Sequence, residues 1–215
     1  CDRDMDVALT KYGFKNLMIW HNDATLPKCD LVVLPGGFSY GDYLRCGSIA
    51  GKSKIIKSVI DFANSGGLVL GICNGFQILT ETGLLPGVLQ RNKYLNFICR
   101  NIHVKINDKN NQYFKDIKKD VLEFHIAHNE GNYFCSEDEL KIINNNNQIA
   151  LTYCSSDGLE DNEYNPNGAL KNIAGIFNKE KNVLGMMPHP ERMIDKHLSG
   201  EDGSIFFENL MNNSK

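Results

Sequence analysis

The sequence lacks the features that define several large classes of protein. Its 215 residues include one tryptophan and six prolines, and neither charge dominates, since 23 Lys and Arg stand against 26 Asp and Glu. Because there is no basic excess, we expect no nucleic-acid partner. No apolar run approaches the roughly 18 residues of a membrane-spanning helix, so we expect no membrane association.

Cysteine is present, but in no pattern that builds disulfides or zinc sites. The seven cysteines are an odd number and no two are spaced C-x-x-C; they stand at positions 1, 29, 46, 73, 99, 135 and 154. This usage indicates reduced thiols, a cytoplasmic location and no metal site. We expect most of these cysteines to be inert, because a buried thiol behaves as a small hydrophobic side chain.

The hydrophobic pattern predicts an α/β fold. Apolar strands at 31–34 and 68–71 are each followed by a glycine-rich turn, with helices expected at 48–64 and 73–82, which is the order of a parallel α/β unit. Further strands are expected at 17–20, 97–106, 121–127, 142–143, 149–154, 173–178 and 183–186, and terminal helices at 2–12 and 203–211. We therefore expect a single domain, 1–215. Its central sheet should be mostly parallel with helices on both faces and an added antiparallel strand region.

A cysteine lies in the sharp turn that follows the strand at 68–71. Gly71-Ile72-Cys73-Asn74-Gly75 has the form G-x-C-x-G, which matches the G-x-S-x-G nucleophile elbow with Cys in place of Ser. Glycines suit such a turn because neighbouring backbone crowds it on both sides. The helix N-terminus would favour the thiolate. The segment predicts either a nucleophilic Cys73 or a buried cysteine beside a glycine-rich turn.

A general base is predicted directly after the strand at 183–186. In Met187-Pro188-His189-Pro190-Glu191, the side chains of His189 and Glu191 share a face of an extended segment, and Pro190 stiffens the pair. Glu191 could accept a hydrogen bond from one imidazole nitrogen while the other faces a thiol, as in a catalytic triad. The alternative is a loop histidine paired with a neighbouring carboxylate.

Backbone donors for an oxyanion are predicted after the strand at 31–34. Pro35-Gly36-Gly37 ends that strand, and glycines allow N–H groups to approach a ligand closely. Gly37 N–H and Asn74 N–H are the candidate donors. Because the carboxyl ends of parallel strands meet at one edge of the sheet, these donors, Cys73 and His189 should converge there. The combination indicates acyl transfer through a thioester.

These segments together resemble the class I, or triad-type, glutamine amidotransferases, and the resemblance covers essentially the whole chain. It is carried by G-x-C-x-G-x-Q at 71–77, HPE at 189–191, IAHNEGNY at 126–133 and LVVLPGGFSYGDYLRCGSIA at 31–50. Within the last stretch, GGFSYGDYLR is the most specific part and is similar to glutaminase subunits of purine biosynthesis. The resemblance implies the α/β fold of this family.

The resemblance assigns roles to the predicted site. Cys73 would be the nucleophile, His189 the general base and acid, and Glu191 the residue that orients His189. Gly37 and Asn74 would supply the oxyanion hole. The implied reaction is the hydrolysis of glutamine to glutamate and ammonia.

The resemblance also assigns a substrate-binding region. Gln77, one helical turn beyond the nucleophile, would contact glutamine. The loop with His128, Glu130 and Gly131 would lie over the substrate. Asn129 departs from the family pattern, because glycine is expected there.

Partners are implied as well. Ammonia would pass through a channel to a separate synthetase subunit, and a small third subunit usually bridges the two. The chain has no G-x-x-x-x-G-K-[ST] loop, so we expect no cofactor in it and place ATP and Mg²⁺ on the synthetase. Family members begin with an apolar strand and a P-G-S-N-type turn before the residues matching 1–4. We therefore expect the natural protein to be longer.

Three alternatives remain open from the sequence. The chain could be a glutaminase serving another synthetase, such as that of guanylate or anthranilate synthesis, but GGFSYGDYLR argues against this. It could be a cysteine hydrolase related to α/β peptidases or chaperone-like proteins, which would lack the combination of HPE and Gln77. It could also be a scaffold subunit that keeps the motifs without activity.

Overall fold

The computed structural model describes residues 1–42, 45–197 and 200–214, so Tyr43 and Leu44 of the GGFSYGDYLR stretch lie outside it. Its α-helices are α1 (Asp2–Lys11), α2 (Cys46–Ala50), α3 (Ile55–Asn64), α4 (Asn74–Glu81), α5 (Glu137–Asn145) and α6 (Asp202–Asn213). Its strands are β1 (Leu31–Leu34), β2 (Leu68–Ile72), β3 (Val88–Gln90), β4 (Ile98–Ile106), β5 (Val121–His128), β6 (Asn132–Phe134), β7 (Ile149–Cys154), β8 (Ile173–Phe177) and β9 (Val183–Met186). Short 3₁₀ turns, including η1 (Ser39–Asp42) and η4 (Pro190–Arg192), punctuate the loops.

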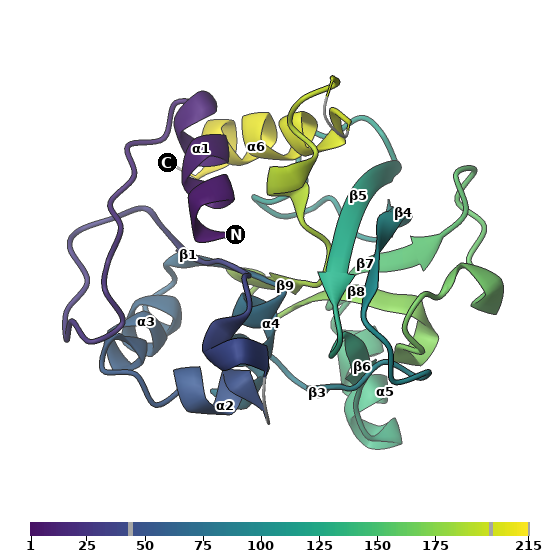
Figure 1. The fold of residues 1–215 in the computed structure, drawn as a ribbon, viewed down its shortest axis with the longest axis horizontal. Coiled ribbons are helices and arrows are strands. Elements are labelled where there is room, and N and C mark those ends of the chain that lie inside the picture. Colours follow the sequence, from purple (N-terminus) through teal and green to yellow (C-terminus); the bar gives the residue numbers. More distant parts are fainter. Residues whose placement is uncertain (43–44, 198–199, 215) are drawn as a thin grey trace.

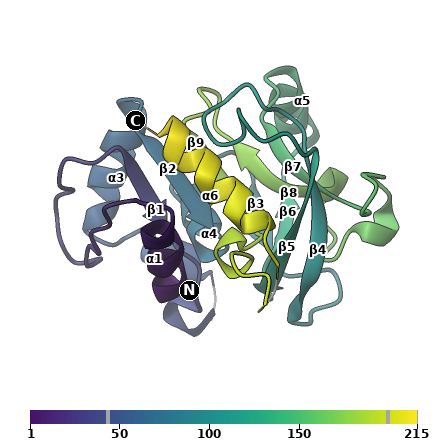
Figure 2. The same ribbon diagram turned by 90° about the horizontal axis from the view of Figure 1, so that it is seen from above.

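One curved sheet organises the described residues. Its strand order is β1-β2-β9-β8-β7-β4-β5; β1, β2 and β9 pair in parallel, and the remaining pairs are antiparallel. Helices α1 and α6 lie above the sheet in Figure 1, and α2, α3 and α4 lie below it. Seen from above in Figure 2, α6 crosses the sheet towards β5, against which it packs. The α/β fold class with an added antiparallel region is confirmed.

Two kinds of strand follow from two hydrophobic patterns. All five residues of β2 are buried, because helices cover the parallel part of the sheet on both faces. Burying each large aliphatic side chain there contributes about 1.5–3 kcal/mol. In β5 burial alternates along the strand, so Phe124, Ile126 and His128 turn inward while His125 turns to the other face.

Three of the predicted elements were wrong. Residues 17–20 form no strand, and the side chains of Leu17, Met18 and Trp20 are exposed. Residues 142–143 belong to α5, whose start has the capping pair Ser136 and Glu139; Ser136 Oγ accepts a hydrogen bond from the Glu139 N–H at 3.2 Å. The helix expected at 48–64 is divided into α2 and α3. A short apolar run does not distinguish strand from helix, and here the cap decided the outcome.

The position of β1 also differs from expectation. The run LVVL predicted a strand at the centre of the sheet, yet β1 ends the strand order of the described residues and only Val32 is buried. An apolar run predicts that the side chains are buried, but it does not predict which neighbouring elements bury them or where the strand lies in the sheet. The separate antiparallel pair of β3 and β6 was not expected, because three-residue strands carry too few positions to show a period.

The structure contains no helix in its described ranges that is both long enough and apolar enough to cross a membrane.

Candidate active site

The backbone at Cys73 is held in a sharp elbow between β2 and α4. Its φ of 52° and ψ of −105° lie outside the regions that ordinary residues favour, and such strain is typical of nucleophile elbows. A Cβ on Gly75 would lie 1.9 Å from the Leu34 carbonyl oxygen, so only glycine permits this crossing. The elbow presents Cys73 at the carboxyl end of β2 with its side chain almost wholly enclosed.

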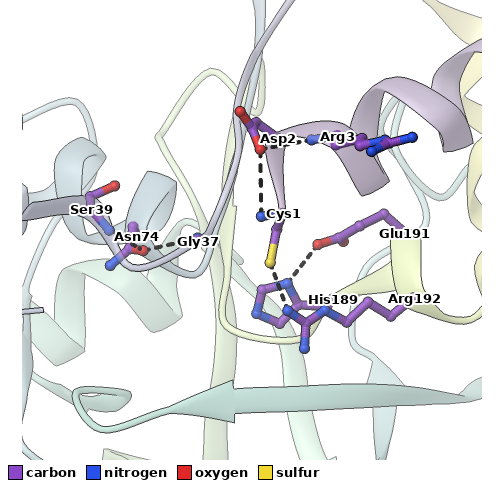
Figure 3. A network of polar contacts seen from close by, with 9 residues as sticks. All are labelled: Cys1, Asp2, Arg3, Gly37, Ser39, Asn74, His189, Glu191 and Arg192. Carbon is purple, nitrogen blue, oxygen red and sulfur yellow. Dashed lines mark hydrogen bonds and ion pairs between the residues drawn. The ribbon is translucent and has the colours of Figure 1, made fainter. Parts of the chain in front are cut away.

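His189 follows β9, the strand next to β2, and is paired with Glu191. Its Nδ1 lies 2.6 Å from Glu191 Oε1, and both side chains are buried (Figure 3). The backbone also fixes this segment, because the His189 N–H donates to the His125 carbonyl at 2.8 Å and thereby ties the loop to β5. The sequence predicted this contact from an extended segment, but Pro190–Arg192 form the 3₁₀ turn η4, and Glu191 meets the imidazole from within this turn.

Gly36 lies between the side chains of Cys73 and His189. A Cβ at this position would lie 2.8 Å from His189 Cε1 and 3.0 Å from Cys73 Cβ, so both side chains border the same glycine. The ends of β1, β2 and β9 therefore meet at one edge of the sheet, as the positions of Cys73, His189 and Glu191 in the sequence indicated. The arrangement of Cys73, His189 and Glu191 is compatible with a catalytic triad.

Opposing effects act on the pKa of His189. Burial by itself lowers this pKa, but the negative charge of Glu191, together with Cys73 and hydrogen bonds to both residues, outweighs it and raises the pKa above the usual 6.5. His189 Nδ1 is occupied by Glu191, so the buried Nε2 is the imidazole nitrogen left to interact with Cys73. The raised pKa of His189 favours the protonated imidazolium.

The predicted oxyanion donors lie where the loop after β1 touches the start of α4. The Gly37 N–H donates to Asn74 Oδ1 at 3.0 Å, and the Ser39 N–H donates to the same oxygen at 3.3 Å (Figure 3). The side chain of Asn74 thus holds the loop against the elbow. In this state the Gly37 donor is engaged by the protein itself.

Gln77 lies one turn further along α4, in a buried polar network. Its Oε1 accepts hydrogen bonds from Asn74 Nδ2 at 2.8 Å and from the Cys46 thiol at 2.9 Å. Its Nε2 donates to the Glu130 carbonyl at 2.9 Å, which ties the loop at 128–131 to α4. Gln77 and Glu130 also line one small cleft together with Arg45. Cys46 was not predicted from the sequence, because nothing nearby signals a polar role for it.

His128 lies beneath the loop that was predicted to cover the substrate. Its Nδ1 is 3.1 Å from Asn92 Oδ1, which also accepts a hydrogen bond from the Gly131 N–H at 3.1 Å. A Cβ on Gly131 would lie 2.4 Å from the His128 ring, so the glycine packs directly on the imidazole. Burial, helped by the charge of His189, lowers the pKa of His128 to about 3 and keeps it neutral at pH 7.

Cys1 and Arg192 also border the triad, although the sequence did not indicate it. Arg192 Nη2 donates to Cys1 Sγ at 2.8 Å (Figure 3). Ligand atoms of Cys1, His189 and Glu191 lie within 4.8 Å of one another, a spacing that a metal ion could bridge. Hydrogen bonds account for this grouping, because His189 Nδ1 is bonded to Glu191 and the sulfur accepts from Arg192. Arg192 could have been suspected because it directly follows HPE.

The parallel strands, the cysteine elbow and the buried His–Glu pair define a triad-type amidotransferase site. Residues 1–201 match the model of the CobB/CobQ-like glutamine amidotransferase domain, and the chain belongs to this family. It is 73% identical to the phosphoribosylformylglycinamidine synthase subunit PurQ of Pelagibacter ubique, in an alignment that covers 100% of this chain and 95% of that protein. The family resemblance read from the sequence is confirmed.

Solved structures agree with this assignment. The chain is similar to one in the structure of PurLQS from Thermotoga maritima, with a TM-score of 0.87 and 36% identity over 100% of this chain and 93% of that one. The glutaminase domain of Trypanosoma brucei CTPS superposes with a TM-score of 0.63 over 99% of this chain and 87% of that one. At 12% identity, the second likeness shows the shared fold alone.

Proposed function

We propose that this chain is the glutaminase subunit of a phosphoribosylformylglycinamidine synthase and that it releases ammonia from glutamine for purine biosynthesis. The observation that supports this most strongly is the buried His189–Glu191 pair beside Cys73, in a chain 73% identical to a protein named as this subunit. The contacts of Gly36 leave the nucleophile and base side by side, as acyl transfer requires.

The reaction begins with attack of the Cys73 sulfur on the carboxamide carbon of glutamine. His189 holds the thiol proton and delivers it to the departing nitrogen, so that ammonia leaves and a γ-glutamyl thioester remains on Cys73. Water then attacks the thioester carbonyl while His189 accepts a proton from it. The proton returns to the sulfur, and glutamate is released.

Three further groups support these steps. Glu191 keeps the imidazole oriented through the Nδ1 contact and stabilises its charge. The backbone N–H groups of Gly37 and Asn74 stabilise the oxyanion of the tetrahedral intermediates, and such a donor is commonly worth about 10²–10³ in kcat. Gln77 and the loop with Glu130 form a wall of the glutamine pocket, which is supported by their mutual hydrogen bond.

The ammonia is used by partners. The relative in the Thermotoga maritima structure belongs to an assembly titled PurLQS. By analogy, we propose that this chain has two partners. One is a synthetase subunit that binds ATP and Mg²⁺ and receives the ammonia, and the other is a small bridging subunit. The chain itself needs no cofactor for a thioester mechanism, and the reduced state of its thiols suits the cytoplasm.

The test uses glutamine labelled with ¹⁵N in the amide group. The chain is combined with the synthetase and small subunits of the same organism, ATP and formylglycinamide ribonucleotide. Incorporation of ¹⁵N into the amidine product supports the proposal, and Cys73→Ala should abolish it while synthesis from added ammonia continues. If Cys73→Ala still uses glutamine, the mechanism is wrong. If label is released as ammonia but never enters the amidine, the chain serves another synthetase.

A further inference from the structure

A second group of thiol, imidazole and amide side chains lies outside the glutaminase site. Cys99 on β4 is exposed, and its Sγ is 3.4 Å from His125 Nε2 on the adjacent strand β5. The other nitrogen of this imidazole, Nδ1, is 3.0 Å from Asn101 Oδ1. Antiparallel pairing places Asn101 opposite His125 and Cys99 two pairs further along, on the same face of the strand, so regular strand geometry fixes the group.

The hydrogen bonds determine the tautomer of His125. Asn101 Nδ2 donates to Glu123 Oε1 at 3.2 Å, which orients the amide so that its oxygen faces the imidazole. Since Asn101 Oδ1 can only accept, His125 Nδ1 carries the proton and the lone pair of Nε2 points at the Cys99 thiol. The order is nucleophile, base and orienting amide, which is the logic of a Cys-His-Asn triad.

The charge state of His125 also suits a base. Burial, assisted by the positive charges of Arg192 and His189, lowers the pKa of His125, while Glu191 opposes this. The imidazole is therefore neutral at pH 7 and can accept a proton. This group differs from the active site, where Glu191 raises the pKa of the imidazole.

Four of the other cysteines do not share these properties. Burial is the main reason that the thiol pKa values of Cys29, Cys135 and Cys154 are raised, and a raised pKa disfavours the reactive thiolate. Cys46 is buried and donates its proton to Gln77. Cys99 combines exposure to solvent with a neutral imidazole at hydrogen-bond distance, contrary to the expectation that cysteines other than Cys73 are inert.

We propose that Cys99 is a site of reversible thiolation by small disulfides, with His125 as its general base. The Cys99 sulfur attacks one sulfur of the disulfide, a new S–S bond forms and the old one breaks. His125 Nε2 takes the thiol proton and gives it to the departing thiolate, so one disulfide and one thiol become a mixed disulfide and one thiol. This inference is independent of the glutaminase reaction.

The test uses the full chain and bis(hydroxyethyl) disulfide, an uncharged probe, followed by trapping of free thiols with N-ethylmaleimide and tryptic mass mapping. Trypsin cuts after Lys93 and Arg100 and isolates Cys99 on its own peptide, while Cys29 falls on the peptide 29–45 as an internal reference. We expect Cys99 to form the mixed disulfide about ten times faster than Cys29 at pH 7. The rate advantage of Cys99 should not exceed this order of magnitude by much. An ordinary thiol is already a few per cent thiolate at pH 7 and therefore reacts measurably without a base.

His125→Gln removes the base and should slow thiolation of Cys99 about tenfold. His21→Gln is the matched control, since it removes an exposed imidazole that packs on Trp20, and it should leave the rate unchanged. Cys99→Ser should eliminate the adduct and keep glutaminase activity, which also verifies folding. A Cys99 rate equal to that of Cys29, or one that His125→Gln does not alter in a protein with native circular dichroism, would overturn the proposal.

Discussion

The side chain of Asn74 holds the backbone N–H of Gly37, with a distance of 3.0 Å from the nitrogen to Oδ1. The same N–H is the proposed donor to the oxyanion, so the Asn74 side chain and the reacting oxygen would share this donor. Because Asn74 Oδ1 also accepts from Ser39, one carboxamide fixes the entire start of the loop after β1. Asn74 therefore has a structural role through its side chain besides the proposed role of its backbone N–H.

Replacing Asn74 tests whether this anchor matters for catalysis. Asn74→Ala removes the acceptor for two loop N–H groups, so the Gly37 donor should lose its fixed position. We expect kcat for glutamine hydrolysis to fall about tenfold, a fraction of the 10²–10³ that complete loss of an oxyanion donor costs. KM should change less, because Gln77 keeps its bond to Glu130. Steady-state glutaminase kinetics measure both constants, and an unchanged kcat would contradict the anchoring role.

Gly36 gives a steric test of the triad. In Gly36→Ala the new Cβ would stand 2.8 Å from His189 Cε1 and 3.0 Å from Cys73 Cβ, so the base and nucleophile must move apart. A misplacement of this size lowers kcat by about 100-fold. The control is Gly66→Ala, where φ is +93° and no atom lies within 4 Å. It should cost about 1–2 kcal/mol of stability from left-handed strain and leave kcat intact. Equal activities for the two variants would show that the site is assembled differently.

The charge of Glu191 should control the protonation of His189. Glu191→Gln keeps the shape but removes the charge that outweighs burial, so the pKa of His189 should fall from above 6.5 to below it. In the wild type, protonated His189 stabilises the folded state fully below the unfolded value near 6.5, and this stabilisation is lost as pH rises through the raised folded pKa. Imidazole NMR signals followed against pH measure the shift. A pKa of His189 unaffected by Glu191→Gln would refute the coupling.

The same contact predicts an order of activities. In the proposed mechanism Glu191 orients the imidazole and His189 transfers the protons, so Glu191→Ala should reduce glutaminase turnover less than His189→Ala does. Initial rates of glutamate formation by the two variants provide the comparison. An equal or larger loss for Glu191→Ala would give Glu191 a second role in the reaction.

His128 predicts acid sensitivity of the fold. Its pKa is about 3 when folded, against about 6.5 when unfolded. As the pH falls below about 6.5, His128 binds a proton in the unfolded chain but stays neutral in the folded protein. The free energy of unfolding therefore falls by about 1.4 kcal/mol per pH unit. Between pH 6.5 and pH 5 this amounts to about 2 kcal/mol. Urea unfolding should show a correspondingly smaller loss for His128→Gln over this range, and identical losses in both proteins would exclude His128 as the cause.

Much of the site could be predicted because its residues follow strands in short, distinctive segments. Cys73 comes directly after β2 and His189 after β9, and parallel strands deliver their carboxyl ends to one edge. The HPE segment also predicted the His189–Glu191 contact, although Glu191 reaches the imidazole from the 3₁₀ turn η4 and not from an extended segment. Local sequence therefore contained most of the geometry of the triad.

The remainder depended on contacts between distant segments. Cys1 borders Arg192 across almost the whole length of the sequence, and no spacing rule relates them. The engagement of Gly37 by Asn74 depends on how two loops meet. The strand expected at 17–20 illustrates the opposite failure, since its apolar pattern found no partner strand among the described residues. The hydrophobic pattern indicates which secondary structure a segment can form, and tertiary contacts determine whether that structure forms.

The central claim is that Cys73 is an activated nucleophile in a pocket shaped for glutamine. Intact-mass analysis after incubation with a chloroketone analogue of glutamine tests it directly, with and without the synthetase subunit. We expect one adduct per chain, on the tryptic peptide that contains Cys73, absent in Cys73→Ala and suppressed by excess glutamine. No adduct under either condition, or an adduct that persists in Cys73→Ala, would show that Cys73 is not an activated nucleophile in such a pocket.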